Sequence, residues 1–255
     1  MINVLDFPLL VLLLSFFLLW LSTRLGVAYR RRRAHMEKTV HEDFGVVLAA
    51  SLTLLALIIG FSFSMATNRY DQRKNLEEEE ANAIGTEYVR ADLLPAADAA
   101  KVRALLRNYL DQRVLFYSLR ADEQVRQVNA RTAQLQNELW AAILPPAAAQ
   151  PTQIVALAVS GMNDVLNSQG YTQAAWWNRI PVAAWILMAA IAICCSALVG
   201  YFERNDQAEG LPHVVLPFIV SLSFFLIADI DSPRGGVIRV KPQNLISLVE
   251  SLRPQ

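Results

Sequence analysis

The stretch FGVVLAASLTLLALIIGFSFSMA, residues 44–66, decides the fold of this 255-residue chain. Its 23 residues include no charged side chain. A helix rises about 1.5 Å per residue, so about 20 apolar residues cross a hydrocarbon layer of roughly 30 Å. Buried helices of soluble proteins seldom contain so long an apolar run. The stretch therefore predicts a membrane-spanning helix.

Three more stretches have this character: residues 5–21, with Asp6 as their one charged residue, residues 180–202 and residues 211–228. Overall the chain is 54% hydrophobic and 18% charged, whereas about a quarter of the residues in a soluble domain are charged. We expect the first stretch, rich in Leu, Phe and Val, to be a retained helix that faces lipid, because Met1 to Leu5 contain no basic residue and no small-residue cleavage site follows. The prediction is an all-α membrane protein with four transmembrane helices.

Between the second and third spans the pattern changes to amphipathic helices. Neither Gly nor Pro occurs between Phe61 and Gly85, which predicts one long helix over residues 44–94. Helices are also predicted over residues 97–119, 122–144 (ending at Pro145 and Pro146) and 152–168 (ending at Gly170). The predicted organisation is transmembrane helices in 1–66, a helical extramembrane domain in 67–179, transmembrane helices in 180–231 and a short tail in 232–255. We expect the tail to be at most partly ordered after Val240.

The loop between the first two spans is strongly basic, with Arg24, Arg30 to Arg33 and Lys38. The positive-inside rule places such a loop in the cytoplasm and the helical domain on the other side of the membrane. Basic residues also flank the spans at the opposite face, including Arg69 and Arg179. The charge count is therefore nearly balanced, and the tetra-arginine cluster decides in favour of this orientation.

Small and polar residues recur along one face of the second span at steps of three and four, from Ala49 to Asp71. Such a face either packs closely against another helix or, where several copies share an axis, lines a water-filled passage. The pore-lining candidates are Thr53, Ala56, Gly60, Ser64 and Thr67.

Six carboxylates are candidates for attracting ions: Asp71, Glu77, Glu78, Glu80, Asp229 and Asp231. The four consecutive glutamates from Glu77 span a helical turn, so they form either a solvated helix face or, in part, an acidic ring around a pore mouth. Asp229 and Asp231 end the fourth span, where they either hold the chain as it leaves the membrane or form a hydrated pair that coordinates an ion or binds a proton.

Other classes of function have no support in the sequence. It contains no nucleotide-binding loop, no nucleophile elbow and no HExxH, and its three histidines lack metal-ligand spacing. We therefore expect no enzymatic activity, no metal and no cofactor. The net charge of zero gives no reason to expect nucleic acid as a partner. The expected partners are the lipid bilayer, further copies of the chain and inorganic ions.

Two segments, FSFSMATNRYDQRKNLEEEEANAIGTEYVRADLLP (61–95) and DIDSPRGGVIRV (229–240), resemble the bacterial bestrophin-like domain family, integral membrane proteins of unassigned function. The family's name implies kinship with bestrophins, pentameric anion channels whose second span forms the pore. This chain lacks an aromatic neck motif of the bestrophin kind, and its acidic helix argues for cations. Fold-level analogy alone does not assign a function.

The sequence thus predicts a homo-oligomeric ion channel of the bacterial inner membrane, leaning towards cations, with a pore lined by the second span. The alternative is a membrane-anchored sensor or scaffold whose helical insert binds a partner or a ligand.

Overall fold

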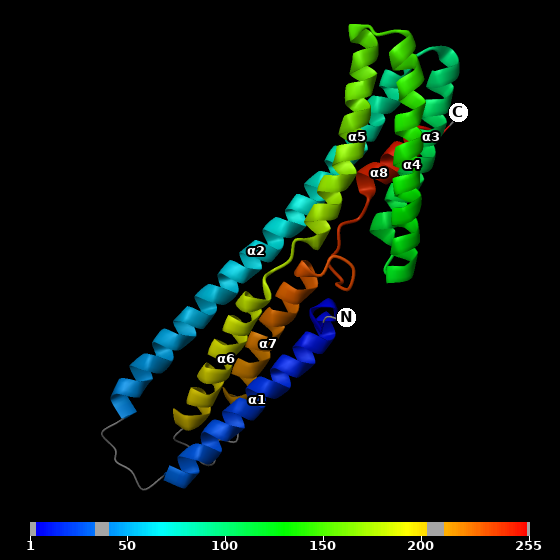
Figure 1. Cartoon of the computed structure of the whole chain (residues 1–255). Helices are drawn as coiled ribbons and strands as arrows, with labels where there is room; N and C mark the ends of the chain where they lie inside the picture. Colours follow the sequence, from blue (N-terminus) through cyan, green and yellow to red (C-terminus); the bar gives the residue numbers. More distant parts are fainter. Residues whose placement is uncertain (1–3, 34–40, 203–211, 254–255) are drawn as a thin grey trace. The chain divides into compact units, whose positions relative to one another are not determined.

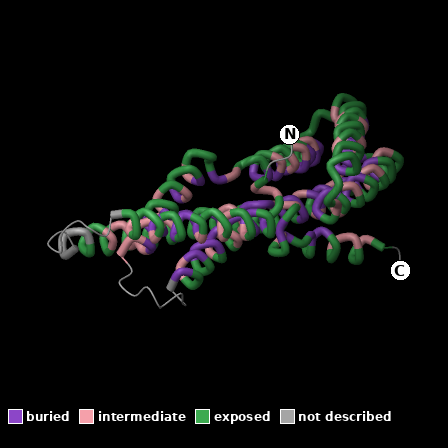
Figure 2. The backbone as a smooth tube through the Cα atoms, turned by 90° about the horizontal axis from the view of Figure 1, so that it is seen from below, coloured by how far each residue is buried: buried purple, intermediate pink, exposed green. Residues whose placement is uncertain are grey.

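The computed structural model describes residues 4–33, 41–202 and 212–253, and every regular element within them is helical (Figure 1). The chain divides into two compact units. The first, here called the membrane unit, comprises Met1–Arg69 and Arg179–Ile238. The second, here called the helical domain, comprises Tyr70–Asn178 and Arg239–Gln255. In both, buried residues form short patches along helices whose other faces are exposed (Figure 2).

The membrane unit contains the 3-10 turn η1 (Val4–Asp6), α1 (Pro8–Arg33), the first part of α2 (His41–Arg90), α6 (Val182–Phe202) and α7 (Pro212–Asp231). Four described helical stretches each contain a segment of 18 residues that is long and apolar enough to cross a membrane: Pro8–Arg32, Gly45–Leu93, Gln153–Phe202, which ends with α6, and His213–Asp231. The four predicted spans are confirmed. The part of the basic loop from residue 34 to residue 40, including Lys38, lies outside the described residues.

Within this unit α1 lies beside α6 and α7 (Figure 1). A methyl group on Gly200 of α6 would overlap the carbonyl of Thr23 on α1, so glycine permits the two backbones to touch. Ser22 donates a hydrogen bond to the carbonyl of Ile193 across the same contact, at 2.8 Å. Within the predicted first span, residues 5–21, Val11 and Leu19 are buried, so the expectation that this span faces lipid is wrong for that side of α1.

The helical domain contains the remainder of α2, the 3-10 turn η3 (Ala91–Leu93), α3 (Ala96–Ser118), α4 (Asp122–Ala149), α5 (Gln153–Trp177) and α8 (Gln243–Ser251). Its core holds apolar side chains from each of these α-helices, among them Ile84, Leu106, Leu135, Met162 and Leu245, all without exposed surface. Apolar stripes at helical spacing pack into such a bundle because each must be covered by another.

The long helix predicted over 44–94 is confirmed, since α2 runs unbroken for 50 residues and passes into η3. Two predicted ends are wrong. Helix α4 continues past Pro145 and Pro146 to Ala149, and α5 continues past Gly170 to Trp177. A glycine inside a helix costs only about 1 kcal/mol, and the extension of α5 buries Trp176.

The C-terminal segment also differs from expectation. Instead of being at most partly ordered after Val240, the tail forms α8 at Gln243–Ser251. Leu245 of α8 is fully buried in the core, and Leu248 lies 3.2 Å from the point that a methyl group on Gly85 of α2 would occupy. Apolar residues at Leu245 and Leu248 lie on one face of a helix, and burial of that face orders the tail.

Candidate functional site

The stripe of small and polar residues on α2 lies on a face with little cover from the described part of the chain. Thr53, Ala56, Gly60 and Ser64 are exposed, and Thr67 is half-buried. A methyl group on Gly60 would have no atom within 4 Å. The side of the same helix that packs within the membrane unit is marked by other residues, namely Leu55, Ser62 and Ala66, which are buried.

The two threonine hydroxyls of the stripe donate to carbonyls of their own helix. Thr53 Oγ1 donates to the carbonyl of Ala49 at 2.8 Å, and Thr67 Oγ1 donates to that of Ser64 at 2.9 Å. A hydroxyl has one donor and two acceptor lone pairs. Because both hydroxyl donors are already used, these two oxygens can act only as acceptors towards a molecule or ion at the stripe.

The candidate carboxylates on α2 divide into two pairs. Asp71 and Glu78 are exposed. Asp71 follows Thr67 by four residues, and Glu78 follows Asp71 by seven, so both continue the face of the stripe along α2. Glu77 and Glu80 are buried.

The buried pair has partners inside the helical domain. Glu77 accepts hydrogen bonds from the backbone N–H of Leu245, at 3.0 Å, and from the side-chain amide of Asn244, at 2.7 Å. The carboxylate therefore holds the first turn of α8, whose free N–H groups favour an anion.

Glu80 is the acceptor in a fully buried cluster. It accepts from the guanidinium of Arg113, from the hydroxyl of Tyr117 at 3.2 Å and from that of Thr172 at 3.3 Å. Burial, and then the charge of Glu80, raise the pKa of Tyr117, which keeps this hydroxyl a donor. Glu80 thus ties α2 to α3 and α5.

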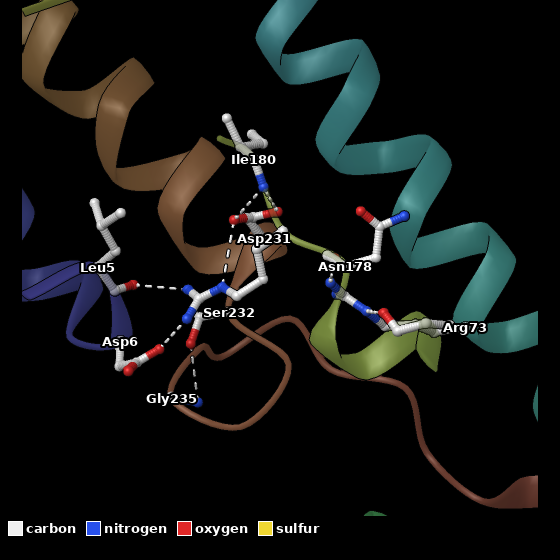
Figure 3. Close-up of polar contacts among 10 residues, drawn as sticks. Leu5, Asp6, Arg73, Asn178, Ile180, Asp231, Ser232 and Gly235 are labelled. Atoms are coloured by element: carbon white, nitrogen blue, oxygen red, sulfur yellow. Dashed lines mark hydrogen bonds and ion pairs between the residues drawn. The ribbon is translucent and has the colours of Figure 1, made fainter. Parts of the chain in front are cut away.

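Asp229 and Asp231, at the end of α7, are also buried and occupied. Asp229 accepts from the backbone N–H groups of Val237, at 2.7 Å, and Ile238, at 2.8 Å, and so closes the loop that follows the helix. Asp231 accepts from the backbone N–H of Ile180 with both oxygens, at 3.2 Å (Figure 3). These contacts hold the chain where it leaves the fourth span.

Two arginines that the sequence did not mark as functional each hold the chain within their own unit. In the membrane unit, Arg179 pairs with Asp6, donates to the carbonyl of Leu5 and lies 3.5 Å from the Asp231 carboxylate. Figure 3 labels these three partners. In the helical domain, Arg73 is buried and donates to the carbonyl of Asn178, at the end of α5. A cation there complements the negative end of the helix dipole.

The helical domain also has a polar groove of about 400 Å³ between α4 and α5. Four carboxamides and an indole line most of it: Gln136, Asn137, Trp140, Asn163, Leu166 and Gln169. Among the described residues no group of three His, Cys, Asp or Glu side chains could hold a metal ion.

Known proteins share this architecture. A bacterial bestrophin homologue from Klebsiella pneumoniae, solved as a tryptophan-to-alanine variant, is 13% identical, with a TM-score of 0.65 over 94% of this chain and 97% of that one. Another crystal structure of the Klebsiella pneumoniae homologue is 16% identical, with a TM-score of 0.61 over 95% of this chain and 99% of that one. No curated protein matches the chain. The model of the bestrophin-like domain matches residues 9–245, and the chain belongs to this family of membrane proteins.

Proposed function

We propose that the protein is a homo-oligomeric ion channel whose pore is lined by the α2 stripe of Thr53, Ala56, Gly60, Ser64 and Thr67. The observation that carries this proposal is the exposure of the stripe. A helix in hydrocarbon gains nothing by presenting hydroxyls and a glycine to lipid. Other copies of the chain, or water in a passage between copies, are the environments that suit this face.

The chemistry of the stripe supports cations as the permeating ions. The hydroxyl groups of Thr53 and Thr67 donate their hydrogen bonds within α2. Only the lone pairs of these two oxygens are therefore available to contact a permeating ion. Asp71 and Glu78 extend the same face with negative charge and are exposed. In an oligomer they would form acidic rings that raise the local concentration of cations. Kinship with bestrophins implies that the second span forms the pore, and it also implies that the permeating ions are anions. The negative charge on this helix argues instead for cations.

The proposed location is the bacterial inner membrane. The arginines at the end of α1, Arg30 to Arg33, favour the cytoplasm for that end of the helix. The helical domain then belongs to the periplasmic side.

Flux through proteoliposomes tests the pore. Thr53→Leu should reduce cation flux because a larger apolar side chain would narrow and dehydrate the passage. Thr53→Ser, which retains the hydroxyl and removes only a methyl group, is the matched control and should retain flux. Native mass spectrometry should give the same oligomer for all three proteins. A monomeric wild type, or full flux in an assembled Thr53→Leu protein, would contradict the proposal.

A second candidate, a membrane-anchored sensor, draws support from the polar groove between α4 and α5. Carboxamides both donate and accept hydrogen bonds, and the indole of Trp140 offers an apolar face, so the groove suits a neutral polar ligand or peptide. The activity of a sensor should be unchanged by Thr53→Leu and reduced by Trp140→Ala. Thr53→Leu and Trp140→Ala together therefore separate the two functions.

A further inference from the structure

A carboxyl group lies buried in the helical domain where neither the proposed pore nor the Glu80 cluster uses it. Glu87 of α2 has no exposed surface. Its two carboxyl oxygens accept no hydrogen bond from any residue that the structure describes. A charged carboxylate in such surroundings is costly, so a proton or a cation must compensate it.

The surroundings of Glu87 are arranged by a glycine on the facing helix. Gly161 of α5 is buried, and a methyl group added to it would overlap a carboxyl oxygen of Glu87. The same methyl group would lie 2.6 Å from Nη1 of Arg90. The carboxyl of Glu87 and the guanidinium of Arg90 therefore meet at one point on α5, which only glycine leaves open.

Arg90 nevertheless has a different carboxylate as its ion-pair partner. Its Nη1 lies 3.9 Å from an oxygen of Asp164, one turn along α5 from Gly161, and the Asp164 side chain is 64% exposed. Arg90 thus lies between two carboxyl groups, one buried and one in solvent.

The other charged groups near this end of α2 have partners of their own or face solvent. On α3, Arg103 pairs with Asp92 of η3 and donates to the carbonyl of Tyr88, and Arg107 donates to the Tyr88 hydroxyl. On α8, Glu250 is exposed. The charges that act on Glu87 are those of Arg90 and Asp164.

We propose that Glu87 is a proton-binding site that controls the contact between α2 and α5. With its proton, Glu87 packs as a neutral group on Gly161 and leaves Arg90 to Asp164. When the proton leaves, Arg90 turns to the buried carboxylate, and Asp164 loses its partner. No other reactant is needed, because the proton passes to bulk water.

The electrostatics agree with this geometry. Burial, partly offset by Arg90, raises the pKa of Glu87 from 4.5 to about 8, and Asp164 adds to the rise. A pKa that is higher in the folded than in the unfolded protein means that folding favours the protonated form. The contribution of Glu87 to stability is therefore complete below pH 4.5 and is lost as the pH rises towards about 8.

Difference infrared spectroscopy of the full-length protein tests the site. The carbonyl band of a protonated carboxylic acid should be present at neutral pH in the wild type and should disappear as the pH passes about 8. Glu87→Gln should lack that band, and Glu78→Gln, an exposed carboxylate on the same helix, should retain it. Thermal unfolding should show the matching loss of stability with pH in the wild type and in Glu78→Gln, and a smaller loss in Glu87→Gln.

Asp164→Asn tests the competition for Arg90. Without the Asp164 charge, Arg90 is available to Glu87, so the band should disappear at a lower pH than in the wild type. Asp164 lies at the surface, and the variant should fold normally. The proposal is overturned if the band persists unchanged in Glu87→Gln, if the wild type shows no protonated carboxyl at neutral pH, or if Asp164→Asn leaves the transition where it was.

Discussion

Glu80 of α2 and Arg113 of α3 form an ion pair inside the helical domain, and neither side chain has any exposed surface. The Arg113 guanidinium also lies over the ring of Phe116, 4.4 Å from its centroid. Removal of two charges from water is costly, and that cost is offset only while each charge has the other as its partner. This pair fixes the inward face of α2 in the helical domain, and with it the outward face that carries Asp71 and Glu78.

Removal of one partner of this pair should destabilise the domain strongly. Arg113→Met leaves the Glu80 carboxylate buried without its cation, at a cost of about 3–5 kcal/mol. The thermal unfolding midpoint in detergent measures the effect. The double variant Arg113→Met with Glu80→Gln should recover part of the loss, and Glu79→Gln, at an exposed position, should change little. A single variant as stable as the wild type would show that the pair does not hold α2.

Asp229 should act on the loop after α7 rather than on conduction. Asp229→Ala leaves the N–H groups of Val237 and Ile238 without their acceptor, and hydrogen bonds to a charged group are worth about 1.5–3 kcal/mol each at most. Limited proteolysis near residue 237 should become faster. Asp229→Asn retains one acceptor oxygen, so its rate of proteolysis should lie between those of the wild type and Asp229→Ala. If a well-folded Asp229→Asn protein changed ion flux, the purely structural role would be refuted.

Gly200 should tolerate no side chain, whereas Gly170 should. Gly200→Val forces a side chain into the carbonyl of Thr23, so α1 and α6 must separate and the yield of folded protein should fall. Gly170→Ala meets no atom within 4 Å and should stabilise α5 by about 0.5–1 kcal/mol. The thermal unfolding midpoint, compared with that of the wild type, should be lower for Gly200→Val and higher for Gly170→Ala.

The acidic face of α2 should set ion selectivity. Asp71→Asn combined with Glu78→Gln should shift the reversal potential in a salt gradient towards that of anions, because the proposed ring of negative charge is lost. The shift should be larger at low ionic strength, where charges are screened less. Glu79 is also exposed, but it lies about 100° around the helix from Glu78. The variant Glu79→Gln therefore serves as the control. An equal shift in the control would assign the effect to net charge alone.

Local pattern was sufficient for the elements that one stretch of chain determines alone. The four apolar runs predicted the four spans, and the absence of Gly and Pro after Phe61 predicted the length of α2. The end of α5 was misjudged because Gly170 carries a helix penalty of only about 1 kcal/mol. Proline carries a larger penalty, about 3 kcal/mol, and α4 nevertheless continues past Pro145 to Ala149 with Pro146 buried. In the helical domain, Arg113 follows Tyr109 by four residues and Leu110 by three, so it lies on the buried face of α3. Nothing in that spacing identifies Glu80 as its partner.

Sequence by itself determined that α2 has a small and polar face and that this face continues into Asp71 and Glu78, because helical periodicity depends only on neighbouring residues. Only the tertiary structure decided which carboxylates remain open to solvent. Glu77 accepts hydrogen bonds from α8, and Glu80 accepts them from side chains of α3 and α5. Asp229 accepts one from the backbone of a loop eight residues further on, and Glu87 packs against Gly161. The cost of burying a carboxylate depends on donors brought from distant parts of the chain, and no local pattern records where those donors will lie.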